Sequence, residues 1–172
     1  ALGRTVSYAP APNYRLTSEE GTDPVDLTDG ELSDHPRGQL WFQSKCVGWS
    51  YGGRVNLSLD LGQVEPIREI AIRIQGGAPQ GGIATPVWLA AVVSDDGETW
   101  RRVGEYSSFE RGDNQRFDVP RNEGQPWVHR FRFDDIQTRG RYVGLTFYGA
   151  GLTVADEMYV FRGDHNPDEC DI

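Results

Sequence analysis

The chain of 172 residues contains few cysteines, few histidines and no long apolar run. Its two cysteines are too few to form a disulfide framework, and its three histidines lack the spacing of a zinc site. No stretch approaches the roughly 20 apolar residues that a membrane-spanning helix needs. Cys46 and Cys170 leave two interpretations open, either one bridge that ties the C-terminal tail to the body of the protein or two free thiols.

Basic residues are also in the minority. The sequence has 17 Lys and Arg residues against 26 Asp and Glu residues, a formal net charge of -9. Nucleic acids are bound by clustered basic side chains, so we expect no nucleic acid among the partners. Binding to membrane lipids needs apolar spikes beside a basic set, which is lacking, so we expect no membrane partner. The acidic balance is compatible with cation binding.

Motifs of catalysis are missing as well. The sequence has no Gly-x-Ser-x-Gly elbow of a serine hydrolase. The pair Asp134-Asp135 falls at a predicted turn and does not resemble the acid/base pair of a glycosidase. The glycine-rich segment 75–82 lacks the Gly-Lys-Ser/Thr ending of a phosphate-binding loop. We therefore expect a protein that is not an enzyme.

Glycine, proline and aromatic residues are plentiful, with 21 Gly, 10 Pro, 5 Trp, 7 Tyr and 7 Phe, which favours an all-β chain with many turns. Between residues 55 and 61 every odd position is apolar, the period of a half-buried strand. The runs that predict strands are 55–61, 67–74, 87–94, 100–103, 127–133, 141–148 and 157–162, with an edge strand at 115–119 and a short strand near Trp41. About eight short strands without a convincing helix predict an all-β fold, an antiparallel β-sandwich of jelly-roll type.

The domain organisation expected from the sequence is a single module over residues 1–172, since no repeat or linker interrupts it. Residues 1–26 are expected to form an irregular lead, because Pro10 and Pro12 break any ladder. Residues 163–172 form an acidic tail. The start at Ala1 is compatible with a removed leader or with a module cut from a longer polypeptide.

Seven short motifs occur in one order: 27–30 (Leu-Thr-Asp-Gly), Trp41, 57–62 (Leu-Ser-Leu-Asp-Leu-Gly), 70–72, 92–100, 140–145 (Gly-Arg-Tyr-Val-Gly-Leu) and 156–160 (Asp-Glu-Met-Tyr-Val). In this order they resemble the discoidin or coagulation-factor C-type (galactose-binding-like) superfamily, whose bacterial members include carbohydrate-binding modules of family thirty-two. The resemblance implies an eight-stranded jelly roll, a structural calcium ion, ligand binding by loops at one end, and core positions for Trp41 and Trp100.

The resemblance places calcium between the Asp-Gly turn and the acidic pair before the last strand. It implies side-chain oxygens from Asp29 and Glu157, main-chain carbonyls from Asp26, Glu31 and Asp156, and a further ligand at Asp34. A hard cation prefers six to eight such oxygen ligands. The alternative is that these acids are solvated turn and capping residues. The Ca²⁺ ion would pin two segments that are distant in sequence, and so act on stability.

The loops expected to bind ligand are 43–54, 75–86 and 148–153. Sugar sites place an aromatic face against a pyranose ring and flank it with hydrogen-bonding groups. The candidate ligand-binding residues in these loops are Lys45, Trp49, Tyr51, Arg54, Gln80 and Tyr148. Trp49 has two interpretations, a stacking platform or a buried anchor of its loop.

The function expected from these features is that of a non-catalytic carbohydrate-binding module. It would target an attached enzyme or surface protein to polysaccharide, in a secreted, periplasmic or cell-surface setting, where tethering makes a weak site useful. The expected partners are carbohydrate and other domains of the same polypeptide. The alternative is a discoidin-like protein-interaction or structural accessory domain, which a contiguous apolar face on the side of the sandwich would favour.

Overall fold

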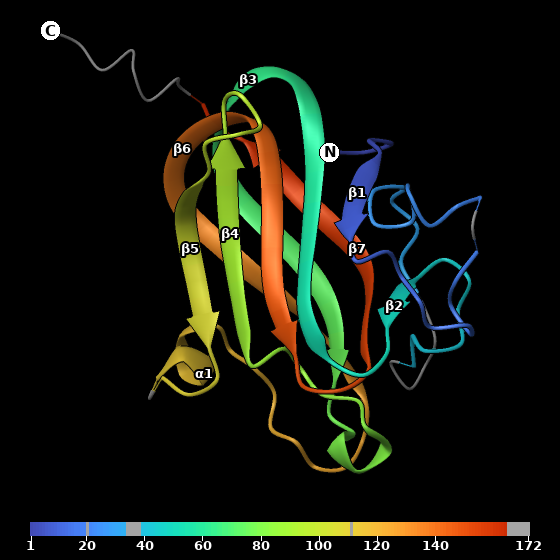
Figure 1. The fold of residues 1–172 in the computed structure, drawn as a ribbon. Helices are drawn as coiled ribbons and strands as arrows, with labels where there is room; N and C mark the ends of the chain where they lie inside the picture. Colours follow the sequence, from blue (N-terminus) through green and yellow to red (C-terminus); the bar gives the residue numbers. More distant parts are fainter. Residues whose placement is uncertain (20, 34–38, 111, 165–172) are drawn as a thin grey trace, which may run out of the picture.

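The computed structural model describes residues 1–19, 21–33, 39–110 and 112–164 (Figure 1). Its strands are β1 (Val6–Ala9), β2 (Val47–Trp49), β3 (Gly53–Gly76), β4 (Trp88–Ser94), β5 (Arg101–Ser107), β6 (Trp127–Gly149) and β7 (Thr153–Arg162). A single turn of 3-10 helix, η1 (Pro79–Gly81), and one short helix, α1 (Asp113–Arg116), accompany them. All strand pairs are antiparallel, in the order β2-β7-β3-β6-β4-β5 with β1 beside β3. The predicted antiparallel β-sandwich is confirmed.

Two long strands, β3 and β6, run through both layers of the sandwich. They pair with each other from Gly53 opposite Gly149 to Gly76 opposite Trp127. In one layer this pair is extended by β4, β5 and β1, and in the other by β7 and β2 (Figure 1). Each of these two strands bends where it passes from one layer to the other. Both bends lie at one end of the sandwich, together with the start of the chain and the end of β7 (Figure 1). The opposite end, with η1, α1 and the loops beside them, is called the loop end below.

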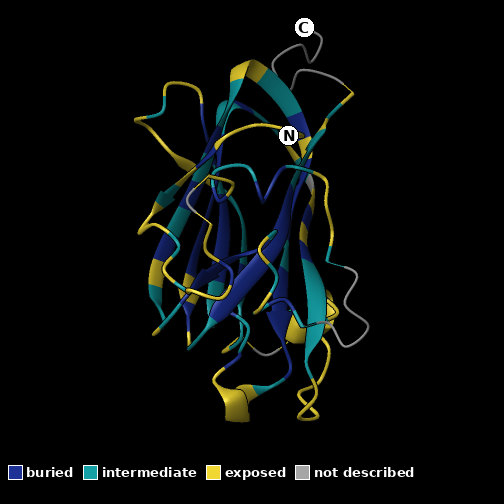
Figure 2. Ribbon diagram, turned by 90° about the vertical axis from the view of Figure 1, so that its right-hand side faces the viewer, coloured by how far each residue is buried: buried dark blue, intermediate teal, exposed yellow. Residues whose placement is uncertain are grey.

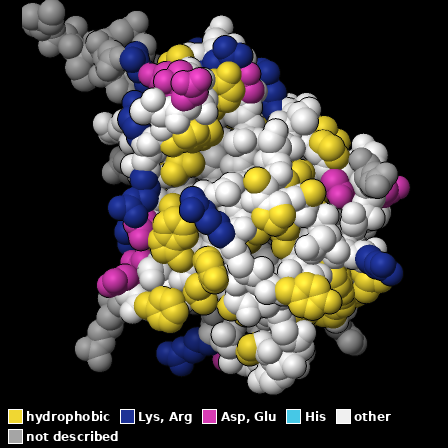
Figure 3. Space-filling model, in the orientation of Figure 1, with side chains coloured by type: hydrophobic (Ala, Val, Ile, Leu, Met, Phe, Trp, Pro, Cys, Tyr) yellow, Lys and Arg dark blue, Asp and Glu magenta, His cyan; other side chains and the backbone are white. Residues whose placement is uncertain are grey.

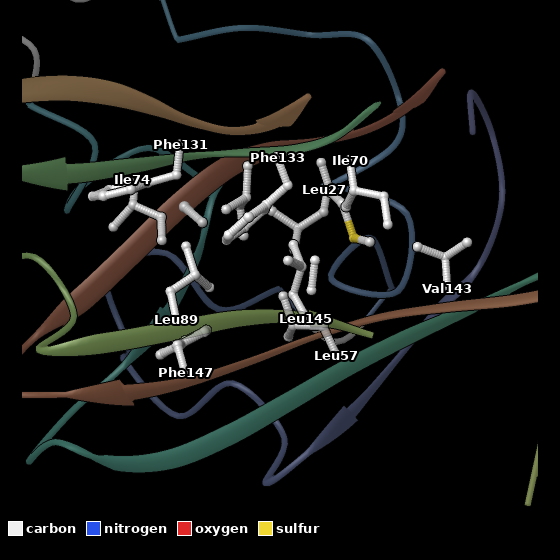
Figure 4. Packing of buried hydrophobic residues seen from close by; sticks show 14 of the residues in the cluster. Leu27, Leu57, Ile70, Ile74, Leu89, Phe131, Phe133, Val143, Leu145 and Phe147 are labelled. Atoms are coloured by element: carbon white, nitrogen blue, oxygen red, sulfur yellow. The ribbon is translucent and has the colours of Figure 1, made fainter. Parts of the chain in front are cut away.

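The hydrophobic core lies between the layers, as the alternation predicts. Val55, Leu57 and Leu59 point inward from the first half of β3, and Ile70, Ile72 and Ile74 from its second half. The inward positions change from odd to even because register shifts occur between Asp60 and Glu65 and between Ile67 and Glu69. An odd slip exchanges the two faces of a strand, and here it keeps both apolar sets inside. Figure 4 shows Ile70, Ile74, Phe131 and Phe133 facing Leu57, Leu89, Leu145 and Phe147 across this core, and Figure 2 shows exposed residues at both ends of the sandwich.

Several predicted element boundaries are wrong. Residues 55–61 and 67–74 belong to one strand, because Gly62, at φ 89°, lies within β3 and does not end it. The short strand expected near Trp41 lies instead at β2. The irregular lead contains β1, which ends at Ala9, directly before Pro10.

The predicted edge strand at 115–119 is also wrong. This segment holds the end of α1 and a tight turn, in which Asp118 adopts a φ of 54° that no extended strand allows. Alternating residue types over five positions were too short a signal to separate a strand from a helical turn.

The tryptophan expected in the core at position 100 lies outside it. Trp100 is 39% exposed and covers Gly144 on the outer face of the sheet. A Cβ atom added to Gly144 would lie 3.2 Å from the Trp100 ring. Trp41, Trp88 and Trp127 are half-buried. Cys46 is buried, while Cys170 lies outside the described residues, so the proposed bridge remains a prediction.

Among the described residues, no helix is long and apolar enough to cross a membrane.

We expect Gly104→Ala to destabilise the fold, because a Cβ atom at this position in β5 would overlap the Phe133 ring. Overpacking of this kind costs about 1–3 kcal/mol. Urea denaturation should show the loss, whereas Gly21→Ala, at a position with no atom within 4 Å of the added carbon, should leave the midpoint nearly unchanged. Equal midpoints for the two variants would contradict this packing.

Candidate functional site

Three of the loops at the loop end are held together by backbone hydrogen bonds. Gly52 N donates to Gly151 O at 3.0 Å, Leu152 N donates to Gly82 O at 2.8 Å, and Val87 N donates to Tyr148 O at 2.9 Å. These contacts join the turn after β2, the connection from β3 to β4, and the turn after β6. The structure therefore brings together the three segments in which the sequence analysis expects ligand binding.

Exposed tyrosines stand at this end. Tyr51 is 98% exposed on the turn between β2 and β3, where its φ of 72° turns the chain sharply. Tyr148 is 53% exposed near the end of β6. Both rings present apolar faces and a phenolic hydroxyl to solvent, the combination that stacks on a sugar ring and bonds its hydroxyls. In Figure 3, the loop end is at the bottom of the view, and apolar side chains gather on the lower part of the visible face, with basic side chains between them.

Tyr148 belongs to a row of outward-facing residues across three strands, which we call the aromatic row. Arg54 on β3 and Trp88 on β4 are its cross-strand partners on either side. The Arg54 Nε atom donates to Asn56 Oδ1 at 3.3 Å, and the Trp88 Nε1 atom donates to Glu105 Oε1 at 2.7 Å. These bonds orient the Arg54 guanidinium and the Trp88 indole. Both acceptors, Asn56 and Glu105, belong to strands of the same layer, so this layer fixes the side chains of the row.

The sequence analysis did not include Trp88 in the site. Its indole is only half-buried, on the outer face of β4. The alternation contained the missing signal. Leu89 points inward and is fully buried, so its neighbour at 88 must face outward.

Trp49 is not a stacking platform. Its side chain is 2% exposed, its Nε1 atom donates to Pro10 O at 3.0 Å, and its ring packs edge-on against Phe147 at 5.5 Å and against Tyr8 at 5.7 Å. The short strand β2 pairs with β7 through Trp49 and Thr153, which turns the indole inward. The second interpretation, a buried anchor of its loop, is the one that the structure supports.

The remaining ligand-binding candidates differ in exposure. Gln80 is exposed on η1, within the connection from β3 to β4. Lys45 lies half-buried in the turn before β2. Gln75, at the end of β3, is fully buried, and its Oε1 atom accepts a hydrogen bond from Leu40 N at 2.8 Å. Of the loop residues, Tyr51, Arg54, Gln80 and Tyr148 are therefore accessible to a ligand.

The Asp-Gly turn and the acidic pair Asp156-Glu157 do meet, as predicted, although the pair lies within β7 and not before the last strand. Met158 N donates to Leu27 O at 2.7 Å, and Gly30 N donates to Glu157 Oε2 at 3.2 Å. The Asp156 Oδ2 atom accepts from Ser33 N at 3.1 Å, which adds a third link between the segments.

Burial shifts the pKa of several acids at this meeting point, although each accepts at least one hydrogen bond. Burial, with Asp29 and Asp156 nearby, raises the pKa of Glu157 to about 7, and burial raises the pKa of Asp26 to about 6 despite its hydrogen bond from Thr22. The Asp156 Oδ1 atom is buried without a hydrogen-bond partner. Such a cluster of carboxylates has the charge that a cation would neutralise.

The fit to a metal ion is partial. In the described part of the chain, no three ligating side chains are close enough together to hold a metal ion. Asp156 uses one oxygen in an ion pair with Arg73 at 3.2 Å, and Asp29 accepts a hydrogen bond from Glu31 N at 2.7 Å. Main-chain carbonyls, which the resemblance assigns to Asp26, Glu31 and Asp156, would have to supply the other ligands. Asp34 lies outside the described residues.

No protein-family model and no curated protein matches the sequence. Solved structures of similar shape include a family 32 carbohydrate-binding module produced by Clostridium perfringens, 15% identical, with 93% of this chain and 94% of that chain covered and a TM-score of 0.52. A fucose-binding module of Streptococcus pneumoniae is 12% identical, with 95% and 94% covered and a TM-score of 0.58. The lectin domain of lectinolysin, solved with Lewis B antigen, is 13% identical, with 94% of each chain covered and a TM-score of 0.58. The chain therefore has the galactose-binding-like fold of discoidin domains and family 32 carbohydrate-binding modules.

Proposed function

We propose that this protein is a non-catalytic carbohydrate-binding module whose ligand lies on the loop end. The observation that carries the proposal is the aromatic row, where an exposed Tyr148 is paired with Arg54 across the strands. The exposed Tyr51 lies beyond the end of the row, on the turn between β2 and β3. Support comes from the fold, because the similar solved structures are named as carbohydrate-binding modules and lectin domains.

The chemistry of the row suits a pyranose. The Tyr148 ring offers an apolar face for the C–H groups of the sugar, and the Arg54 guanidinium offers a planar fork of donors for adjacent hydroxyls. Glycines at the neighbouring turn let the backbone approach closely. A Cβ atom on Gly52 would lie 2.6 Å from Gly149 O, so only glycine fits there.

The setting of the module is part of the same proposal. We infer a secreted, periplasmic or cell-surface protein in which the module is joined to an enzyme or another domain and brings it to polysaccharide. A single shallow row gives modest affinity, and tethering to a partner that binds the same polymer raises the effective affinity by mass action.

A second candidate function is an accessory domain that docks against another protein. Its basis is the outer face of the second layer, where the Tyr159 and Phe161 rings stack at 5.9 Å with an interplanar angle of 10°. Arg130 lies 4.3 Å over the Tyr159 ring and pairs with the buried Glu69 at 2.6 Å. Aromatic and Arg side chains of this kind are enriched at protein interfaces.

Tyr148→Ala should weaken glycan binding about tenfold or more, because the stacking face of the row is lost. The measurement is a glycan array followed by titration calorimetry with the best ligand. Trp100→Ala, at the opposite end of the same sheet, is the matched aromatic control and should retain wild-type affinity.

Two outcomes would contradict the proposal. One is a folded wild-type protein that binds no glycan on the array. The other is equal loss of affinity in both variants. Loss of a protein partner in Tyr159→Ser, with glycan binding absent throughout, would favour the docking function.

We also propose that calcium joins the Asp-Gly turn to the acidic pair. What supports it is the contact of Gly30 with Glu157 and the unpartnered oxygen of Asp156, both in a cluster of carboxylates. Asp29 and Glu157 would supply side-chain oxygens to the ion, and the main-chain carbonyls of Asp26, Glu31 and Asp156 would supply further ligands. The ion would stabilise the fold and would not touch the aromatic row.

Calcium at 100 times its dissociation constant should stabilise the protein by about 2.7 kcal/mol, a rise in melting temperature of roughly 5–10 °C. Differential scanning fluorimetry with calcium and with chelator measures the difference. Glu157→Gln should abolish the response, while Glu65→Gln, a carboxylate at the bends paired with Arg162, should keep it. Identical melting temperatures with and without chelator, and no metal by elemental analysis, would refute the proposal.

A further inference from the structure

A cavity of about 740 Å³, lined by polar and apolar atoms alike, opens at the loop end beside the segment that connects β5 to β6. Its volume falls within the range of small-ligand pockets. It is lined by Thr85, Tyr106, Ser108, Asn114, Gln115 and residues 118–122. None of these residues belongs to the aromatic row or to the calcium cluster, and only Thr85 lies in a loop in which the sequence analysis expects ligand binding.

The base of the cavity is the hydroxyl end of a core residue. Tyr106 is 1% exposed, and its ring packs at 4.9 Å from Phe131 and 5.3 Å from Phe117. Its hydroxyl donates to Asn114 Oδ1 at 2.7 Å. This bond occupies the amide oxygen of Asn114, so the Nδ2 group remains as a donor in a fixed orientation.

The wall of the cavity is held in place on both sides. Ser107 N donates to Asp113 Oδ2 at 2.8 Å, which fixes the start of α1, and Val119 N donates to Asn114 O at 2.8 Å, which closes the turn after it. Phe117, between these two contacts, is 8% exposed and inserts into the core. The wall is thus anchored by packing before any ligand arrives.

One residue of the wall has an unusual backbone. Asp118 has a φ of 54°, in the left-handed region that non-glycine residues seldom adopt. Strained backbone of this kind persists where the surrounding structure holds it, and it gathers at binding sites. Here it lies between Phe117, fixed in the core, and Val119, which lines the cavity.

The lining has the chemistry of a site for a neutral, hydroxylated ligand. Three carboxamides and three hydroxyls offer both donors and acceptors, and the two charges, on Asp118 and Arg121, oppose each other. A single carboxylate does not suit a metal ion, and one basic and one acidic side chain leave the lining without a net charge that would attract an anion. Val119 and Pro120 add a small apolar surface for the C–H groups of the ligand.

We propose that this cavity is a second ligand site, specific for a neutral monosaccharide unit and separate from the aromatic row. The two are linked through Val87, whose N–H bonds Tyr148 and whose carbonyl accepts from Ser108 N at 2.9 Å. Tyr148 faces outward from its sheet, whereas Tyr106 points into the space between the layers. The inference shares its ligand class with the proposed function but depends on none of its residues.

The test is a titration of the ¹⁵N-labelled full chain with neutral hexoses, N-acetylhexosamines and glucuronic acid, each followed by NMR. The neutral sugars should shift the backbone amides of Thr85, Ser108 and Asn122. Gln115→Ala should weaken this binding about 5- to 10-fold, the effect of losing one or two hydrogen bonds. Gln63→Ala, an exposed glutamine at the bends, is the matched control and should bind as the wild type.

Tyr148→Ala separates the two proposals, because it should weaken binding at the row about tenfold or more and leave the shifts at the cavity unchanged. A chain that shows cavity shifts but no glycan binding at the row would support the second site and reject the first. The inference is overturned if no neutral sugar shifts the cavity amides in the folded protein, if only glucuronic acid does, or if Tyr148→Ala removes the cavity shifts as well.

Discussion

The antiparallel pairing of β3 with β6 is the constraint on which the rest of the structure depends. These strands are hydrogen-bonded from one end of the sandwich to its bends and back again in the other layer. All other strands except β2 and β5 add directly to this pair. Because both strands cross between layers, neither layer can shift against the other without breaking the ladder. The aromatic row lies on this rigid frame, and the loops that line the cavity extend from it.

The alternation of apolar residues was enough to predict the longer strands and their inward residues, but it missed β1 and β2 and misassigned 115–119. Leu57, Ile72, Phe131 and Leu145 all lie in the core as their spacing indicates. The pattern could not predict that 55–61 and 67–74 form one strand, β3, or that 127–133 and 141–148 form one strand, β6. Bends and register shifts depend on how the layers close over the core, and this closure leaves no periodic signal in a single strand.

The candidate site was predictable in its loops and only partly in its residues. Exposure of Tyr51 and Tyr148 fits the expectation, whereas Trp49 lies in the core because a three-residue pairing with β7 turns it inward. So short a strand has no detectable period. The cavity was not predictable, since its hydroxyl and amide residues look like ordinary loop residues until Tyr106 and Phe117 fix them. The meeting of Gly30 with Glu157, 127 residues apart, was found through the motif order and not through local chemistry.

The end of β7 and the aromatic row lie at opposite ends of the sandwich, so the length of the strands fixes the distance between them. β7 ends at the bends, and the first half of β3, from Gly53 to Asp60, spans the layer between the bends and the aromatic row. Eight residues of extended strand measure about 26 Å. Arg162 therefore lies about that far behind the surface that carries the aromatic row. The module would act as a spacer as well as an anchor, and the length of any linker would decide whether a partner reaches the same polymer chain or a neighbouring one.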